Sequence, residues 1–176
     1  LSNDQWIILL SAVQEKMKWL YSKKGVSYVI ISINHGKTSG SISSHPHVQI
    51  TTLPRIPPLI EEEAITFQKS VSELGICPMC TVMNRELGSP RQILITDQFL
   101  AFCPWAPTHS YEFWIVPRKH QTSFIKVTQK EIGDLSLILR STLGGLAKSL
   151  DKPSFNLIFH ISSEKKTKKQ IHWHIE

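Results

Sequence analysis

Three polar side chains alternate along one short segment that could carry phosphoryl chemistry. His45, His47 and Gln49 are each separated by a single residue. Because successive residues of a strand face opposite sides, an extended segment would present all three on one face. A neutral imidazole can attack phosphorus and form a phosphoramidate, which a second acceptor then breaks. Gln49 could donate its amide hydrogen to a non-bridging phosphoryl oxygen, so the segment predicts phosphoryl transfer through a histidine.

The loop before this segment, residues 34–44, has the composition of a phosphate-binding loop. It is rich in glycine and serine, which offer backbone amides and hydroxyl groups to phosphate oxygens. The candidate phosphate-binding residues are Asn34, Gly40, Ser41 and Ser43. A single His-x-His is more often a pair of structural histidines than a functional site. Its combination with this loop and with Gln49 favours a functional site.

Cys77 and Cys80 have the Cys-x-x-Cys spacing of a zinc knuckle, in which two thiolates lie on one turn. A thioredoxin-like redox pair would open a helix within a βαβ unit, which the surrounding pattern does not predict. Two buried, unpaired cysteines are the other alternative. Since the chain has three cysteines, Cys103 is left over, and a paired disulfide framework is excluded.

The elements that must position these residues occur twice along the chain. A capped helix is followed by a short β-branched or apolar strand, a polar loop and a His-x-His segment. Three features recur 126 or 127 residues apart, namely Ser2 and Thr128 at the helix starts, Tyr28 and Phe155 near the strand starts, and His45 and His172 in the His-x-His segments. One common spacing indicates an internal duplication.

The pattern predicts an α+β fold made of antiparallel sheets with flanking helices and two pseudo-repeats about 127 residues apart. We expect a further helix over residues 59–74 and strands over residues 92–95, 99–103 and 111–116. The predicted division is 1–58, the C-terminal part of a first domain; 59–91, a linker helix with the cysteine pair; and 92–176, a second, truncated domain. The first copy lacks the hairpin strands of the second, and the chain stops two residues past His174, so we expect a fragment.

Composition narrows the classes of function. With 176 residues, 41% hydrophobic and 19% charged, the chain can bury an ordinary core, which argues against disorder. The net charge of +6 suits an anionic partner, either nucleic acid or a phosphorylated small molecule. No nucleic-acid motif accompanies the charge. Since no apolar run reaches the roughly 18 residues of a membrane span and no signal peptide opens the chain, we expect a cytoplasmic protein without a membrane partner.

The motifs together resemble one known family. Asn34-His35-Gly36, Gly40-Ser41 and His45-Pro46-His47-Val48-Gln49-Ile50 resemble the active-site motif of the galactose-1-phosphate uridylyltransferase family, within the histidine-triad superfamily. The run from Tyr111 to His120 and the later His172-Trp173-His174 resemble the second half of that family, so the similarity spans nearly the whole chain. The resemblance implies a duplicated histidine-triad-like fold, in agreement with the repeat.

The resemblance also implies a ping-pong reaction. His47 would attack the α-phosphorus of a nucleoside-diphosphate sugar, release the sugar 1-phosphate and hold the nucleotide until another phosphate takes it. Gln49 would mark a transferase, because simple histidine-triad hydrolases carry a histidine at that position. His45 would be a ligand of a first zinc ion whose other ligands are expected before Leu1, or else a structural hydrogen-bonding residue.

For a second, structural zinc ion, the resemblance favours Cys77, Cys80, His120 and His172, with His174 in reserve. Family branches differ in whether a glutamate or a Cys-x-x-Cys completes this site, and residues 61–63 are glutamates at about the position of the former. His109 and His160 are expected to be surface or core residues. The second copy has Glu176 where the first has its glutamine, so no catalysis is assigned to it.

Three functions remain open at this point. The leading hypothesis is a homodimeric uridylyltransferase acting on UDP-glucose and a hexose 1-phosphate. The second is an adenylyl transferase or phosphorylase that takes ADP-sugars or diadenosine polyphosphates, with inorganic phosphate as acceptor. From another class, the chain could be a zinc-stabilised binding module without activity, although the presence of both His47 and Gln49 argues against this. Nucleic-acid binding ranks below these.

Overall fold

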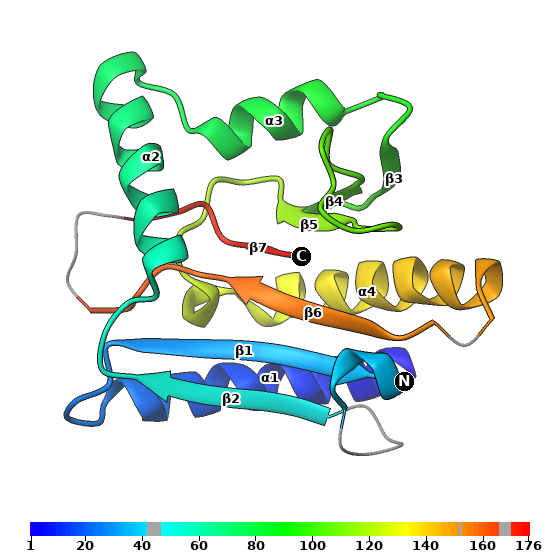
Figure 1. Ribbon diagram of the computed structural model, residues 1–176, viewed down its shortest axis with the longest axis horizontal. Helices are drawn as coiled ribbons and strands as arrows, with labels where there is room; N and C mark the ends of the chain where they lie inside the picture. Colours follow the sequence, from blue (N-terminus) through cyan, green and yellow to red (C-terminus); the bar gives the residue numbers. More distant parts are fainter. Residues whose placement is uncertain (42–46, 152, 166–169) are drawn as a thin grey trace.

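The computed structural model describes residues 1–41, 47–151, 153–165 and 170–176 (Figure 1). The helices are α1 (Asn3–Tyr21), α2 (Pro58–Leu74), α3 (Pro78–Glu86) and α4 (Gln129–Ser149), with short 3-10 turns η1 (Lys37–Ser39) and η2 (Phe124–Lys126). The strands are β1 (Tyr28–His35), β2 (His47–Leu53), β3 (Gln92–Ile95), β4 (Phe99–Phe102), β5 (Trp114–Pro117), β6 (Phe155–His160) and β7 (His174–Ile175). No helix in these ranges is long and apolar enough to cross a membrane.

Both predicted capping boxes are present at the starts of α1 and α4. The Ser2 side chain accepts a hydrogen bond from the backbone N–H of Gln5, whose side chain accepts one in return from Ser2. Thr128 and Glu131 make the same reciprocal pair at the start of α4. Each box satisfies backbone donors that a helix start leaves unpaired. The predicted duplication is therefore visible in the helices as well as in the sequence spacing.

Within the described residues, seven strands form one antiparallel sheet in the order β2-β1-β6-β7-β5-β4-β3. The corresponding strands of the two repeats, β1 and β6, are neighbours in this order, with Ser32 opposite Ile158 and Asn34 opposite Asn156. Strand β2 flanks β1 on one side, and β7 flanks β6 on the other. The α+β prediction and the antiparallel pairing are confirmed.

Helices α1 and α4 pack together along one face of the sheet (Figure 1). Inward residues of β1, namely Val29, Ile31 and Ile33, join Leu10 of α1 and Leu135 of α4 in a core from which water is excluded. On the opposite face, α2 and α3 cover β4 and β5 through a second apolar cluster, and α2 also reaches the end of β6 through the contact between Glu63 and His160. The face of β2, β1 and β6 that points away from α1 and α4 is the one that carries His47.

The cysteine pair opens a helix, contrary to the expectation from sequence. Cys77 is the N-cap of α3, and Pro78 occupies the first helical position, where its missing N–H costs nothing. Met79 and Met83, one turn apart, bury the inner side of this short helix. The strand that follows, β3, pairs antiparallel with β4, so the βαβ context of a thioredoxin-like pair is still not found around these cysteines.

Strand β5 begins later than expected, and β7 is very short. Strand β5 begins at Trp114 rather than at Tyr111, because the Glu112 carboxylate accepts hydrogen bonds from Thr108 and His109 and closes a loop there. Tyr111 adopts a left-handed backbone conformation with φ 64°, which no strand residue can adopt. Strand β7 contains only His174 and Ile175, so His172 precedes the strand.

Candidate functional site

His47 lies in a row of polar side chains across the uncovered face of the sheet. Strand pairing places Asn34 of β1 directly opposite His47 of β2, and Ser32 opposite Gln49. Residues opposite one another in an antiparallel pair point to the same face. His47 is half-buried and Gln49 is exposed. The strand therefore presents His47 and Gln49 together, as the alternation predicted.

The imidazole of His47 contacts the loop predicted to bind phosphate. Its Nδ1 lies 3.4 Å from the Ser41 hydroxyl oxygen. In the tautomer whose Nδ1–H donates to this hydroxyl, the Nε2 lone pair is available to attack an electrophile. The interaction thus fits a nucleophilic role for His47. Ser43 and His45, also predicted as site residues, lie outside the described residues.

Glycines shape the start of this loop. Gly40 follows η1 in the left-handed conformation, with φ 74°. Gly36 precedes η1 with φ 88° and ψ 163°, a combination that is essentially restricted to glycine. A Cβ at Gly36 would also stand 2.8 Å from the Cβ of Ser154 and 2.9 Å from its Cα. Gly36 was part of the recognised motif but was not among the predicted site residues. Glycine is required at position 36 because Ser154 of the other repeat lies so close. Sequence spacing alone does not reveal that contact.

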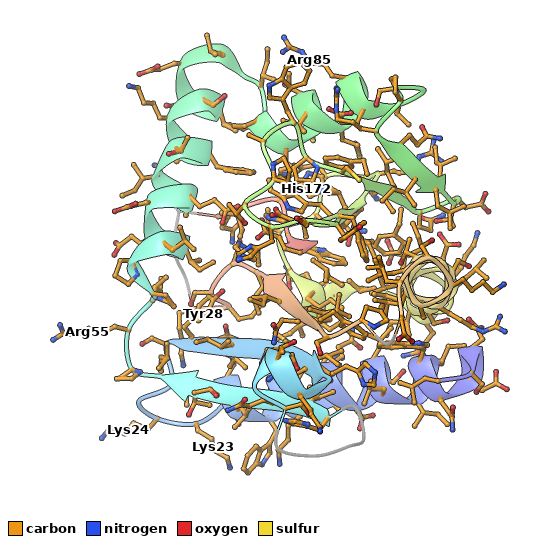
Figure 2. The ribbon with its side chains drawn as sticks, turned by 45° about the vertical axis from the view of Figure 1, so that its right-hand side comes forward. Lys23, Lys24, Tyr28, Arg55, Arg85 and His172 are labelled. Carbon is orange, nitrogen blue, oxygen red and sulfur yellow. The ribbon has the colours of Figure 1, made fainter. Side chains whose placement is uncertain are left out.

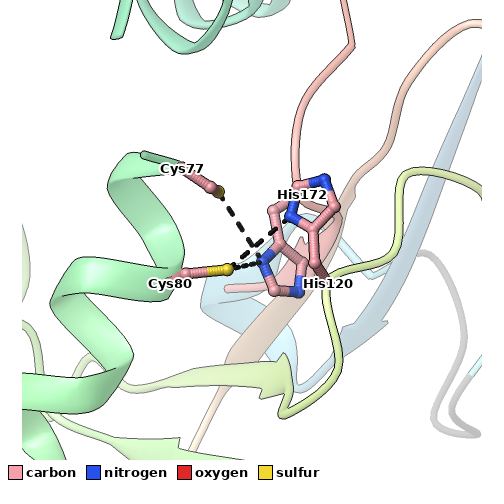
Figure 3. Close-up of side chains that lie close together, drawn as sticks. All are labelled: Cys77, Cys80, His120 and His172. Atoms are coloured by element: carbon pink, nitrogen blue, oxygen red, sulfur yellow. Dashed lines mark hydrogen bonds between the residues drawn. The ribbon is translucent and has the colours of Figure 1, made fainter. Parts of the chain in front are cut away.

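The four predicted ligands of the second metal site lie together (Figure 3). The Sγ of Cys80 is 3.4 Å from Nδ1 of His172 and 3.6 Å from Nδ1 of His120, and the Sγ of Cys77 is 3.9 Å from Nδ1 of His172. One ligand atom from each residue falls within 4.8 Å of the others. Two thiols and two imidazoles form a donor set that suits a tetrahedral metal ion. The geometry can therefore hold a metal.

Burial shifts the pKa values of two side chains in this cluster. His172 is fully buried between α3 and the sheet, whereas Arg85 of α3 extends outward (Figure 2). Burial, together with the neighbouring His120 and His174, lowers the pKa of His172 to about 4, so its imidazole is neutral at neutral pH. Burial and the adjacent Cys77 raise the pKa of Cys80 to about 11. A bound cation would replace the thiol proton and stabilise the thiolate.

A second polar cluster lies on the other side of His172. Glu63, His160 and His174 present ligand atoms within 4.8 Å of one another, and Glu176 joins them. Nδ1 of His160 is 3.3 Å from a Glu63 oxygen, and its ring stacks on His174 with centroids 4.9 Å apart. Although burial opposes it, the two glutamates raise the pKa of His160.

His160 was predicted to be an ordinary surface or core residue. Residues 61–63 were expected at about the position of a glutamate metal ligand and His174 was the reserve ligand, but Glu63 was not singled out. The 14-residue interval between His160 and His174 matches no motif spacing, so only the folded sheet brings this cluster together. His109 lies in an exposed loop, where Nδ1 contacts the Thr108 hydroxyl.

A cavity of about 420 Å³ lies beside β6, between that strand, α4 and the loop before β5. Its lining includes Asn156, Ile158 and Glu176 from the sheet and the loop that carries Tyr111. A cavity of this size is within the range of small-molecule sites. There is therefore room for a ligand beside β6.

No family model matches the chain. Among curated proteins, the Arabidopsis thaliana ADP-glucose phosphorylase is 26% identical over 171 residues, 96% of this chain, and the Thermotoga maritima galactose-1-phosphate uridylyltransferase is 29% identical over 154 residues, 86% of this chain. A solved uridylyltransferase structure superposes with a TM-score of 0.92 at 26% identity and covers 99% of this chain and 55% of the other. The chain is a homologue of the galactose-1-phosphate uridylyltransferases. The family resemblance predicted from the histidine motif is thereby confirmed.

Similarity to the uridylyltransferase family extends over only part of each relative. The chain spans about half the length of the curated relatives it matches, 48% of both the Arabidopsis and the Thermotoga protein. The matched half contains the His47 strand, the loop predicted to bind phosphate and both side-chain clusters. Any proposal for the reaction of the whole protein therefore rests on the residues of this matched half.

Proposed function

We propose that this chain carries the nucleotidyl-transfer site of a UDP-glucose:hexose-1-phosphate uridylyltransferase of the galactose-1-phosphate uridylyltransferase type. The observation that carries the proposal is the contact between His47 and Ser41. It joins an accessible imidazole to a glycine- and serine-containing loop on an uncovered sheet face. Homology to uridylyltransferases supports the same chemistry.

In the first half-reaction, Nε2 of His47 attacks the α-phosphorus of a nucleoside-diphosphate sugar. A P–N bond forms while the bond to the β-phosphate oxygen breaks, and the hexose 1-phosphate leaves with the electron pair. The proton on Nδ1 stays with the imidazole, which Ser41 steadies through its hydroxyl oxygen. In the second half-reaction a phosphate oxygen of the acceptor attacks, the P–N bond breaks and His47 is restored.

Polar neighbours of His47 would stabilise the charge that develops on phosphorus. Gln49 extends from the same strand and the same face, so its amide can donate to a non-bridging oxygen. Asn34, opposite His47, can donate from the other side, and the loop at Gly40 adds backbone amides. Donors carried on a strand and on a structured loop are effective in a transition state because they need little reorganisation.

We propose that Cys77, Cys80, His120 and His172 hold a zinc ion. The donor set and the neutral state of His172 support this assignment. When bound, such an ion supplies a structural cross-link rather than a reactive centre. The four residues would fasten α3 to the segments that follow β5 and precede β7. His45 stays a proposed partial ligand of a first zinc ion.

A second candidate function is transfer of an adenylyl group from an ADP-sugar or a diadenosine polyphosphate to phosphate. The Arabidopsis ADP-glucose phosphorylase matches 96% of this chain, more than the Thermotoga uridylyltransferase does. Both functions use the same histidine and the same phosphate contacts. They differ in the base of the nucleotide and in the acceptor.

Intact-protein mass spectrometry separates the two. The full-length protein is exposed to UDP-glucose or to ADP-glucose with no acceptor present. A uridylyl adduct that forms on the wild type and is absent from His47→Ala supports the uridylyltransferase. An adenylyl adduct that the same substitution abolishes supports the adenylyl transferase. If neither nucleotide adds to the wild type, covalent transfer through His47 is wrong.

The proposal includes the organisation of the protein. Residues 1–58 would supply the transfer strand, residues 59–91 the thiolates, and residues 92–176 the second repeat. As the family resemblance implies, the protein would act as a homodimer on phosphorylated sugars. The composition and motifs add the prediction of a cytoplasmic location, without nucleic acid or a membrane as partner. Light scattering during size exclusion measures the dimer, and a monomer mass at micromolar concentration would contradict it.

A further inference from the structure

A side chain of the second repeat reaches into the site of the first. Asn156 of β6 lies directly opposite Asn34 of β1, and Asn34 in turn lies opposite His47 of β2. The three side chains therefore form one row across three adjacent strands, with Asn34 in the middle. His47 and Asn156 stand at the two ends of this row.

Asn156 makes two hydrogen bonds in this row. Its Nδ2 donates to the Oδ1 of Asn34 at 2.7 Å and to the backbone carbonyl of Ser39 at 2.9 Å. One NH₂ group has two hydrogens, so these bonds use both of them. Ser39 ends η1, and Gly40 and Ser41 of the phosphate loop follow it immediately. A single amide therefore links Asn34 and the start of the phosphate loop to β6.

The first of these bonds fixes the direction of the Asn34 amide. Because the Oδ1 of Asn34 accepts from Asn156, the Nδ2 of Asn34 is turned to the opposite side of its planar amide group. The side chain of Asn34 thus offers hydrogens, and not lone pairs, to a group placed away from Asn156. The orientation is the one that a phosphoryl oxygen beside His47 would require.

We propose that Asn156 is a positioning residue for nucleotidyl transfer: it orients the Asn34 amide and anchors the phosphate loop at Ser39. The inference rests on the proposed function, and it assigns to the second repeat a part in the chemistry of the first. Asn156 touches no reacting atom. It acts through Asn34 and through the loop that carries Ser41 to His47.

Asn156→Asp tests the donor without changing the size of the side chain. An ionised carboxylate accepts hydrogen bonds only, so it repels the Ser39 carbonyl and favours the reversed Asn34 amide, with Oδ1 toward the phosphate. Asn156→Ala removes both hydrogen bonds but does not favour the reversed orientation of the Asn34 amide. We therefore expect Asn156→Asp to lose more activity than Asn156→Ala. Asn84→Asp, an exposed residue of α3, is the matched control for the change of charge.

The readout is the single-turnover rate of nucleotidyl adduct formation in the full-length protein, measured with whichever nucleotide sugar labels the wild type. Losing a preorganised donor costs about 100-fold when the donor itself is removed, so an indirect loss should be about 10-fold for Asn156→Asp. The fall should lie in the maximal rate, with the half-saturating nucleotide sugar concentration within about twofold of wild type. A rate for Asn156→Asp equal to that of Asn84→Asp overturns the inference.

A double-mutant cycle decides whether Asn156 acts through Asn34. In an Asn34→Ala background no amide remains to be oriented, so Asn156→Asp should reduce the rate by clearly less than it does in the wild type. The decrease in rate that remains in this background measures the contribution of the hydrogen bond to the Ser39 carbonyl. Full additivity of the two substitutions contradicts the proposed route through Asn34.

Hydrogen exchange distinguishes failure of this inference from failure of the proposed function. If no nucleotide labels the wild type, the proposed transfer is wrong, and the anchoring by Asn156 is then judged by amide exchange across residues 34–41 alone. Asn156→Asp should raise the exchange rate there several-fold, while Asn84→Asp leaves it unchanged. Unchanged exchange in Asn156→Asp overturns the anchoring, whether or not transfer occurs.

Discussion

His47 and His174 occupy corresponding positions in the two repeats but have opposite surroundings. His47 is half-buried on an uncovered face, and its imidazole contacts the Ser41 hydroxyl. His174 is 1% exposed, contacts Glu176 and stacks on His160. An imidazole enclosed in this way has no access to a phosphorus atom. The difference supports the assignment of transfer to the first repeat alone.

Gln49→Ala tests the amide donor next to the nucleophile. Removing one donor to a developing oxyanion lowers the transfer rate by about 100-fold. Because Gln49 is exposed, the melting temperature should stay within about 2 °C of wild type. Thr51→Ala, the next exposed residue on the same face of β2, is the control and should keep full activity. Equal rates for the two variants, measured by adduct formation, would remove Gln49 from the mechanism.

Gly36→Ala tests the shape of the phosphate loop. The substitution meets both an unfavourable φ of 88° and the backbone of Ser154, so we expect a loss of about 2 kcal/mol in stability and at least a tenfold loss in transfer rate. Gly25→Ala is matched in φ, at 83°, but meets no atom within 4 Å. It should lose stability without losing transfer. Urea unfolding and adduct formation check the two effects, and a fully active Gly36→Ala protein would contradict them.

At the scale of elements, local chemistry made much of the fold predictable. Ser2 and Thr128 begin their helices as the capping boxes indicated, and the apolar run at Tyr28 forms a strand. Each of these signals lies within one element, so a single sequence contains it. The helix α3 was not predicted, because its nine residues are held by burial of Met79 and Met83 rather than by periodicity.

The matching capping boxes predict matching energetic effects. Ser2→Ala and Thr128→Ala each remove one side-chain acceptor from a helix start, and each should lower the free energy of unfolding by about 1 kcal/mol. Ser72→Ala, which removes only a local bond near the end of α2, should change it by less than about 0.5 kcal/mol. Urea unfolding measures all three. A cap variant as stable as Ser72→Ala would contradict the role of that box.

At the scale of the whole molecule, contacts between distant segments determine the site. The Cys-x-x-Cys spacing and the family resemblance together predicted which four residues the structure brings into one cluster. Neither the cluster of Glu63, His160 and His174 nor the bond from Asn156 to Asn34 was predicted. Both depend on β6 lying between β1 and β7, and strand order cannot be obtained from spacing within a motif.

Metal removal should weaken the whole fold. If zinc joins α3 to the segments around His120 and His172, Cys77→Ser should lower the bound zinc, measured by mass spectrometry of the acid-released metal, by about one equivalent. The melting temperature should fall by several degrees. Cys103→Ser, outside the cluster, is the control and should keep its zinc. Unchanged zinc in Cys77→Ser would contradict the proposed ligand set.

The central claim is that the nucleotide is held covalently on His47, and one measurement tests it directly. Full-length protein is mixed with the nucleotide sugar in the absence of acceptor, quenched within milliseconds and digested for peptide mapping. The account predicts about one hexose 1-phosphate released per active site and an acid-labile nucleotidyl phosphoramidate on the peptide that contains His47. A label on any other residue, or release of hexose 1-phosphate with no covalent label, would contradict it.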